Sequence, residues 1–250
     1  MIKYFMEDWN KCKSDDTTYK IDEVKNLLED EESKRVLETR IKVYETGDTS
    51  LLEDISTYNE QYFDKDIIKL SNNEFFIDLG AYTGDTIESF IEQADGSYKK
   101  IIAFEPDHEN MLSLNSYILE NDINNVVTYK LASWNKKETL RFYEDGSFIS
   151  QIYSKGNSTT NANSLDNVLF DIAPVTFIKM DVEGAECQTI EGAEKIIKKY
   201  KPKLAICVYH RARDIYEIPL LIKKLVPEYK LYLRHYSESI LDTVLYATLE

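Results

Sequence analysis

Acidic residues stand at the ends of three apolar runs, and their types and positions give the first indication of chemistry. Asp78 lies near the end of one run, Glu105 directly follows the next, and Asp181 directly follows a third. Runs of this kind are typical of buried strands, and ligands of doubly wound sheets bind beyond the carboxyl ends of the strands. The sequence therefore predicts a ligand site lined by carboxylates at one edge of a sheet.

A glycine-containing turn follows the first run and indicates which ligand fits. Dinucleotide enzymes place G-x-G-x-x-G here, whereas this chain reads Gly80-Ala-Tyr-Thr-Gly84, so the ring of Tyr82 would block the approach of a pyrophosphate. S-adenosylmethionine (SAM) carries no phosphate. Asp78 would hold its ammonium, directly or through water. Glu105 lies 21 residues after Gly84 (105 − 84), near the offset at which an acid accepts ribose hydroxyls.

A second acidic turn, Asp181-Val-Glu183-Gly-Ala-Glu186, follows the third run. Three carboxylates so close together are costly unless they are solvated, hydrogen-bonded or facing a cation, and the sulfonium of SAM is such a cation. Glu186 also fits a structural role as a first-turn helix acid. His210 ends the following apolar run, where it would either reach a methyl acceptor or serve the fold. Asp181, Glu183 and His210 could instead converge on a divalent metal.

The amino-acid composition limits the classes of partner that the protein can bind. Acidic residues outnumber basic ones 45 to 30, which gives a net charge of −15 and disfavours nucleic acid and anionic membranes. We find no apolar run of about 18 residues that could insert into a membrane. The three cysteines form no C-x-x-C pair, which favours a reducing compartment. We expect a soluble, cytoplasmic protein.

Short apolar runs that alternate with amphipathic stretches predict a mostly parallel sheet with crossover helices. The expected strands are Phe75–Leu79, Ile101–Phe104, Val126–Leu131, Thr176–Met180, Leu204–Val208, Tyr229–Arg234 and Thr243–Leu249. The expected helices begin near Asp85, Glu109, Ala185 and Pro219. Only Tyr236–Asp242 separates the last two strands, too short for a crossover, so they should be antiparallel neighbours. The stretch Thr139–Leu165, including the polar Gly156–Ser164, should form a hairpin and a mobile loop.

Residues 1–70 are predicted to form a helical extension, followed by a catalytic domain over residues 71–250. One helix should begin near Ser33 and stop at Gly47, and another should run from Ser50 to Tyr58. Because Tyr58, Tyr62 and Phe63 immediately precede the first strand, we expect the extension to form a lid or the surface of a homodimer.

The chain from about residue 61 onward resembles the FkbM family of SAM-dependent methyltransferases. The resemblance rests on Phe76-Ile-Asp-Leu-Gly-Ala-Tyr-Thr-Gly-Asp-Thr86, Ala103-Phe-Glu-Pro-Asp107, Ile178-Lys-Met-Asp-Val-Glu-Gly-Ala-Glu186 and Tyr209-His210. It implies a Rossmann-like class I fold with a seven-stranded, mostly parallel sheet and an antiparallel last strand. It also implies a SAM site at Asp78, Gly80, Ala81, Tyr82, Gly84, Glu105, Pro106 and Asp181, with Ala132 and Ser133 at the positions that often contact adenine.

The expected reaction is O-methylation of a small molecule, sugar or surface-polysaccharide precursor, phosphoramidate-type modification included. His210 or Glu183 is the candidate general base for the acceptor, and Asp181 should lie near the methyl group. The sequence leaves open whether oxygen or nitrogen accepts the methyl. Two alternatives stay open: a nicotinamide-dependent oxidoreductase on the same fold, against which Tyr82 argues, and a non-catalytic binding protein that has lost the cofactor.

Overall fold

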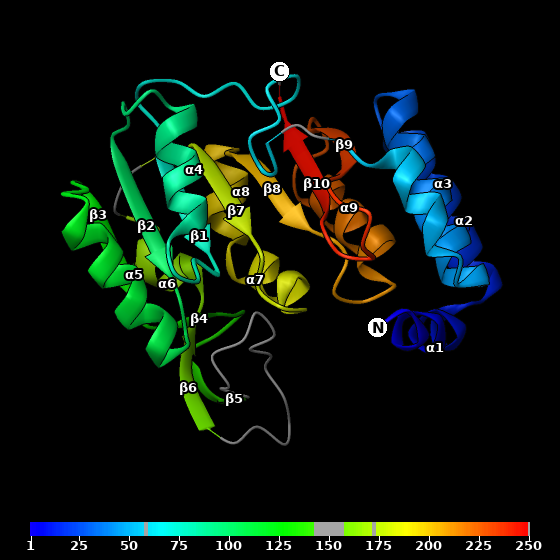
Figure 1. The fold of residues 1–250 in the computed structure, drawn as a ribbon, viewed down its shortest axis with the longest axis horizontal. Coiled ribbons are helices and arrows are strands. Elements are labelled where there is room, and N and C mark those ends of the chain that lie inside the picture. Colours follow the sequence, from blue (N-terminus) through cyan, green and yellow to red (C-terminus); the bar gives the residue numbers. More distant parts are fainter. Residues whose placement is uncertain (58–59, 143–157, 172–173, 250) are drawn as a thin grey trace. The chain divides into compact units, whose positions relative to one another are not determined.

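A computed structural model describes residues 1–57, 60–142, 158–171 and 174–249 (Figure 1). Its main sheet has seven strands in the order β3-β2-β1-β7-β8-β10-β9. These strands are β1 (Phe75–Leu79), β2 (Lys100–Phe104), β3 (Val126–Tyr129), β7 (Phe177–Met180), β8 (Lys203–Cys207), β9 (Lys230–His235) and β10 (Thr243–Thr248).

The direction of the strands follows the expected pattern. β1 pairs in parallel with β2 and β7, and β2 pairs in parallel with β3. β10 pairs antiparallel with both β8 and β9, as the short connection between the last two strands requires. The predicted α/β fold with a mostly parallel sheet and reversed last strand is therefore confirmed.

The chain divides into two compact units, residues 69–203 and residues 1–68 with 204–250. The first unit contains the strands that end at the acidic residues. Its helices are α4 (Asp85–Gln93), α5 (His108–Glu120), α6 (Leu165–Leu169), α7 (Glu186–Gly192) and α8 (Glu194–Tyr200). α4 and α7 begin within one residue of the expected positions, since each follows a strand and a glycine-containing turn.

A small second sheet in this unit corrects one prediction. It joins β4 (Ala132–Ser133), β5 (Glu138–Phe142) and β6 (Ser158–Asn163) in the order β4-β6-β5. The expected hairpin is present as the antiparallel pair β5 and β6. Residues 158–163, expected to lie in a polar loop, form β6 because that strand pairs on both edges, and pairing outweighs low strand propensity. The rest of the expected mobile loop, residues 143–157, lies outside the described residues.

The second unit contains α1 (Ile2–Cys12), α2 (Asp15–Leu27), α3 (Glu31–Thr46), the 3-10 helix η1 (Thr49–Ile55) and α9 (Asp214–Leu225), with β8, β9 and β10. The extension is helical as predicted, and Gly47 ends α3 in the left-handed conformation with φ 73°. The helix expected from Ser50 to Tyr58 is instead the 3-10 helix η1, and Tyr58 lies outside the described residues. The backbone N–H of Leu233 in β9 donates to Ser33 Oγ at 2.9 Å, so α3 packs along this strand.

Pro219 does not start its helix, contrary to the prediction. α9 begins at Asp214, and Pro219 lies inside it. Asp214 accepts a hydrogen bond from the backbone N–H of Arg211 at 2.9 Å, which fixes the preceding turn and so the start of the helix. Because proline has no backbone N–H, Pro219 makes no helical hydrogen bond as a donor, but α9 continues past it to Leu225. Within the described ranges, no helix combines the length and the apolar character needed to span a membrane.

Candidate functional site

The glycine turn after β1 packs tightly against the end of β7. Gly80 has φ +78°, and a Cβ atom placed there would lie 1.8 Å from the carbonyl oxygen of Asp181. Any side chain would therefore push the turn away from β7. Both the unusual φ and this close approach require glycine at position 80.

The backbone N–H groups of this turn bond within the protein. Gly80 and Ala81 both donate to the carbonyl of Phe104, at 3.0 and 3.1 Å. Tyr82, itself left-handed with φ 47°, donates to Glu105 Oε2 at 2.9 Å. A pyrophosphate site needs such N–H groups turned toward the ligand, and here they are already engaged. These three N–H groups are therefore not turned toward a phosphate.

Glu105 joins the ends of two strands. It is 5% exposed, and its Oε1 accepts a hydrogen bond from the backbone N–H of Asp107 at 2.8 Å while Oε2 accepts from Tyr82. Burial raises the pKa of Glu105 to about 7, and these two backbone donors counteract part of that rise. The side chain of Asn110 also hydrogen-bonds to Glu105. A carboxylate has about four acceptor positions, so Glu105 keeps capacity for a further donor.

Asp78 is fully buried beside the same turn. Its Oδ1 lies 3.1 Å from the ammonium nitrogen of Lys179, the residue paired with it in register on β7. Burial raises the pKa of Asp78 to about 6, and the charge of Lys179 opposes the rise. Among the described residues, Asp78 Oδ2 has no hydrogen-bond donor. A buried carboxylate oxygen without a donor suits an ordered water or a ligand ammonium.

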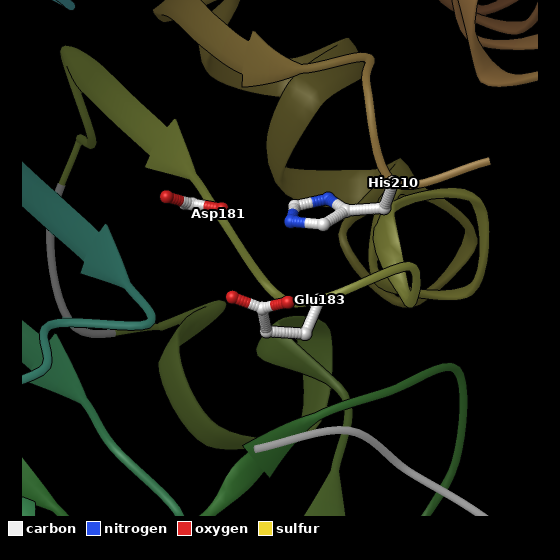
Figure 2. A group of neighbouring side chains, drawn as sticks. All are labelled: Asp181, Glu183 and His210. Atoms are coloured by element: carbon white, nitrogen blue, oxygen red, sulfur yellow. The ribbon is translucent and has the colours of Figure 1, made fainter. Parts of the chain in front are cut away.

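The second acidic turn places two further carboxylates together. Asp181 and Glu183 each offer an oxygen, and these oxygens lie within 4.8 Å of one another (Figure 2). Glu183 is left-handed with φ 55°, a conformation that costs a non-glycine residue about 1 kcal/mol or more. Such strain is concentrated at functional sites in proteins.

Glu186 holds the second turn in shape. It is buried, and its Oε1 accepts hydrogen bonds from the backbone N–H groups of Val182 and Gly184, at 3.1 and 3.4 Å. It is also the first residue of α7, which agrees with the structural role expected for a first-turn acid. By supporting both neighbours of Glu183, Glu186 holds that strained residue in place.

The residues predicted to lie near adenine occupy β4. Ser133 is buried, and its hydroxyl lies 3.0 Å from the hydroxyl of Thr189 in α7. Thr189 also donates to the carbonyl of Ser133 at 3.1 Å. The side chain of Ser133 therefore fixes its strand to α7. Pro106 is half-buried beside Asp107, which caps α5 by accepting from the N–H groups of Glu109 and Asn110.

His210 lies three residues beyond the end of β8, on a segment that is anchored within its own unit. Its side chain is 8% exposed, and its ring centroid lies 4.2 Å from that of Tyr209. Two residues later, the backbone N–H of Ala212 donates to Asp8 Oδ2 in α1 at 2.9 Å. The N-terminal helix thus supports the segment that carries His210.

Comparison with protein families identifies the chain. The methyltransferase FkbM domain model matches residues 78–236, which is more than half of the 250 residues. The chain belongs to the FkbM methyltransferase family. The match contains the glycine turn, Glu105, the second acidic turn and His210.

One solved structure of an FkbM methyltransferase has the same fold. The methyltransferase FkbM from Methylobacillus flagellatus KT is 24% identical and superposes with a TM-score of 0.82, covering 92% of this chain and 58% of that one. The present chain thus spans somewhat over half the length of that protein. An rRNA methylase from Streptococcus thermophilus is 16% identical, with a TM-score of 0.48 over 72% of this chain and 90% of that one. A comparison with curated proteins finds no match.

FkbM enzymes are SAM-dependent, and the observed residues fit this cofactor. Glu105 is buried beside the glycine turn, and among the described residues Asp78 Oδ2 has no hydrogen-bond donor. The N–H groups of Gly80, Ala81 and Tyr82 bond within the protein. The part of the site that the sequence did not reveal is Lys179, the buried partner of Asp78. One signal was present, because Lys179 is the only charged residue in the run Phe177–Met180.

Proposed function

We propose that this FkbM-family chain is an O-methyltransferase that uses SAM to modify a small, sugar or surface-polysaccharide precursor, phosphoramidate-type acceptors included. The observation that carries the proposal is the glycine turn, whose N–H groups bond to Phe104 and Glu105. That arrangement leaves carboxylates, not amide donors, to meet the cofactor. The three cysteines form no C-x-x-C pair, which is consistent with a reaction in the reducing cytoplasm.

The bound cofactor would supply a methyl group on a positively charged sulfur, ready for in-line displacement by an acceptor atom. In this proposal Glu105 accepts the ribose hydroxyls. Asp78 meets the amino-acid end through water, since its side chain is fully buried. Asp181 lies beside the positive charge and favours it electrostatically. Most of the rate enhancement then comes from alignment of the donor and acceptor atoms.

An acceptor hydroxyl must lose its proton as the new bond forms, so the site needs a base. Glu183 and His210 are the two candidates. The strained backbone of Glu183 supports a functional role for its carboxylate. His210 is supported by the sheet order, which places β8 next to β7. We favour His210 as the base and Glu183 as an acceptor ligand.

The proposal is tested by incubating the protein with methyl-labelled SAM and a panel of hydroxylated, amino and phosphoramidate acceptors. Mass spectrometry should detect the label in a hydroxyl-bearing product, and fragmentation should place it on oxygen. Label on nitrogen alone would overturn O-methylation while leaving SAM dependence intact. Binding of a nicotinamide dinucleotide with no binding of SAM would overturn the proposal as a whole.

A further inference from the structure

Lys179 is a buried lysine whose role neither the family motif nor the proposed reaction explains. It lies on β7 and is only 2% exposed. Its Nζ lies 3.1 Å from Asp78 Oδ1 and donates a hydrogen bond to the carbonyl oxygen of Gly80 at 2.7 Å. One ammonium group therefore contacts both the end of β1 and the glycine turn that follows it.

Stability alone does not account for this arrangement. Removing an ammonium and a carboxylate from water costs several kcal/mol per ion, and replacing a buried ion pair with apolar residues is often neutral or stabilising. Both members of the Lys179–Asp78 pair are almost completely buried. A fold that required only strand packing here would do as well with two aliphatic side chains.

The geometry of the corner shows what the lysine controls. Gly80 abuts the carbonyl of Asp181 so closely that no side chain fits, so the turn cannot move toward β7. On its other side the turn is tied to Glu105 through the N–H of Tyr82. The hydrogen bond from Lys179 to the Gly80 carbonyl holds the turn at a third point. Burial raises the pKa of Asp78, whereas the positive charge of the same ammonium lowers it and so favours the ionised carboxylate.

We propose that Lys179 is a positioning residue for SAM, which holds the Asp78 carboxylate and the Gly80 carbonyl in the arrangement that receives the amino-acid end of the cofactor. The proposal rests on the proposed SAM dependence. Lys179 itself touches no reacting atom, so its effect should appear in cofactor binding and not in the chemical step.

The chain offers a matched control for this proposal. Lys203 also pairs with a buried carboxylate, since its Nζ lies 2.6 Å from Glu74 Oε1, and Glu74 precedes β1 at the opposite end of that strand. Lys179→Met and Lys203→Met thus each break one ion pair in the same unit, but only the first pair adjoins the glycine turn.

Calorimetry with SAM and with its demethylated product should first establish binding by the wild-type protein. We expect Lys179→Met to weaken both affinities by about tenfold or more, because a buried carboxylate loses its counter-ion. Lys203→Met should leave them within about twofold of wild type. Turnover of Lys179→Met at saturating SAM should stay within about threefold of wild type.

A double-variant cycle separates positioning from a general loss of structure. If Lys179 acts through Asp78, Asp78→Asn combined with Lys179→Met should bind SAM no more weakly than the weaker single variant. Lys179→Arg and Lys179→Gln keep donors for the Gly80 carbonyl, so they should bind SAM more tightly than Lys179→Met does. They also provide the test if Lys179→Met fails to fold. Additive losses, or unchanged affinity in the folded variants, would overturn the inference. Absence of SAM binding by the wild-type protein would instead overturn the proposed function.

Discussion

At the scale of single residues, Glu105 combines a structural and a proposed binding role. It receives the backbone N–H groups of Tyr82 and Asp107, and so joins the glycine turn to the segment after β2. Burial raises its pKa from the usual 4.5 to about 7. The folded protein therefore holds the Glu105 proton more tightly than the unfolded chain does, which makes stability depend on pH.

We predict that Glu105→Gln removes this dependence. Because the folded-state pKa of Glu105 is raised, its contribution to the free energy of unfolding is most favourable below pH 4.5 and declines as the pH rises to about 7. Urea unfolding between pH 4.5 and 8 should show wild type losing stability relative to Glu105→Gln across that window and no further above it. Asp78 is present in both proteins, so its own titration cancels to first order. Parallel stability curves would contradict the assignment.

The two candidate bases are distinguished by a pair of conservative substitutions. If His210 is the base, His210→Asn should lower kcat by about 10²–10⁴ while SAM affinity stays nearly unchanged, because the role is expressed in the transition state. Glu183→Gln should then mainly raise KM for the acceptor. Steady-state kinetics and calorimetry measure both effects. The reverse pattern would make Glu183 the base.

The same kinetic assay tests the metal alternative. Asp181 and Glu183 have carboxylate oxygens within 4.8 Å of one another, a suitable donor type for a hard cation. Our proposal needs no metal, so activity should survive dialysis against a chelator. Loss of activity that Mg²⁺ or Mn²⁺ restores would show that these carboxylates bind a metal.

At the scale of elements, helix α1 is linked to the segment that carries His210 by one hydrogen bond. Asp8 accepts from the N–H of Ala212, two residues after His210, and the neighbouring Phe5 and Trp9 anchor the helix through buried rings. The helix therefore fixes the backbone of the segment that presents the proposed base. Truncating Asp8 would leave that backbone N–H without its acceptor.

We expect Asp8→Ala to lower kcat several-fold and leave SAM affinity unchanged, because only the His210 segment shifts. Asp16→Ala is the control, since Asp16 lies in the adjacent helix α2 and forms an exposed pair with Lys20 that contributes little. Kinetics of both variants, with thermal unfolding to verify folding, measure the difference. Equal kcat values for the two variants would contradict a supporting role for α1.

At the scale of the whole molecule, the N-terminal extension is packed into its unit along the edge strand β9. Arg234 in this strand is 6% exposed and pairs with Asp30 at 2.7 Å. Arg40 of α3 is completely buried and donates to the carbonyl of Ile240 at 2.5 Å. These contacts make the helices part of the core of the unit, in addition to any role as a lid or dimer surface.

Deletion of residues 1–48 should therefore lower the melting temperature as well as turnover. It removes Asp30 and Glu32 from the buried guanidinium of Arg234, which would keep Asp64 at 3.8 Å. A buried charge that loses part of its counter-charge destabilises the fold. Calorimetric unfolding and light scattering of the truncated and full chains would measure stability and oligomeric state together. A truncated protein with wild-type stability, kinetics and mass would refute both the packing argument and the lid or dimer hypothesis.

The sequence by itself determined the parallel sheet, its reversed end and the family. These features depend on local patterns: an apolar run, then an acid, then a glycine turn, repeated at intervals that a crossover helix fills. Asp78, Glu105 and Asp181 could be placed at strand ends for the same reason. The stop of α3 at Gly47 was equally local, since the left-handed conformation favours glycine.

Only the tertiary structure decided which groups meet across long stretches of chain. The bond from Lys179 to Gly80 joins residues 99 apart, and the bond from Ala212 to Asp8 joins residues 204 apart. β6 likewise became a strand through pairing with two neighbours and not through its own polar sequence. Periodicity and turn chemistry act over a few residues. The partner of a buried charge or of a strand edge comes from a distant part of the chain, and local sequence patterns do not reveal which part that is.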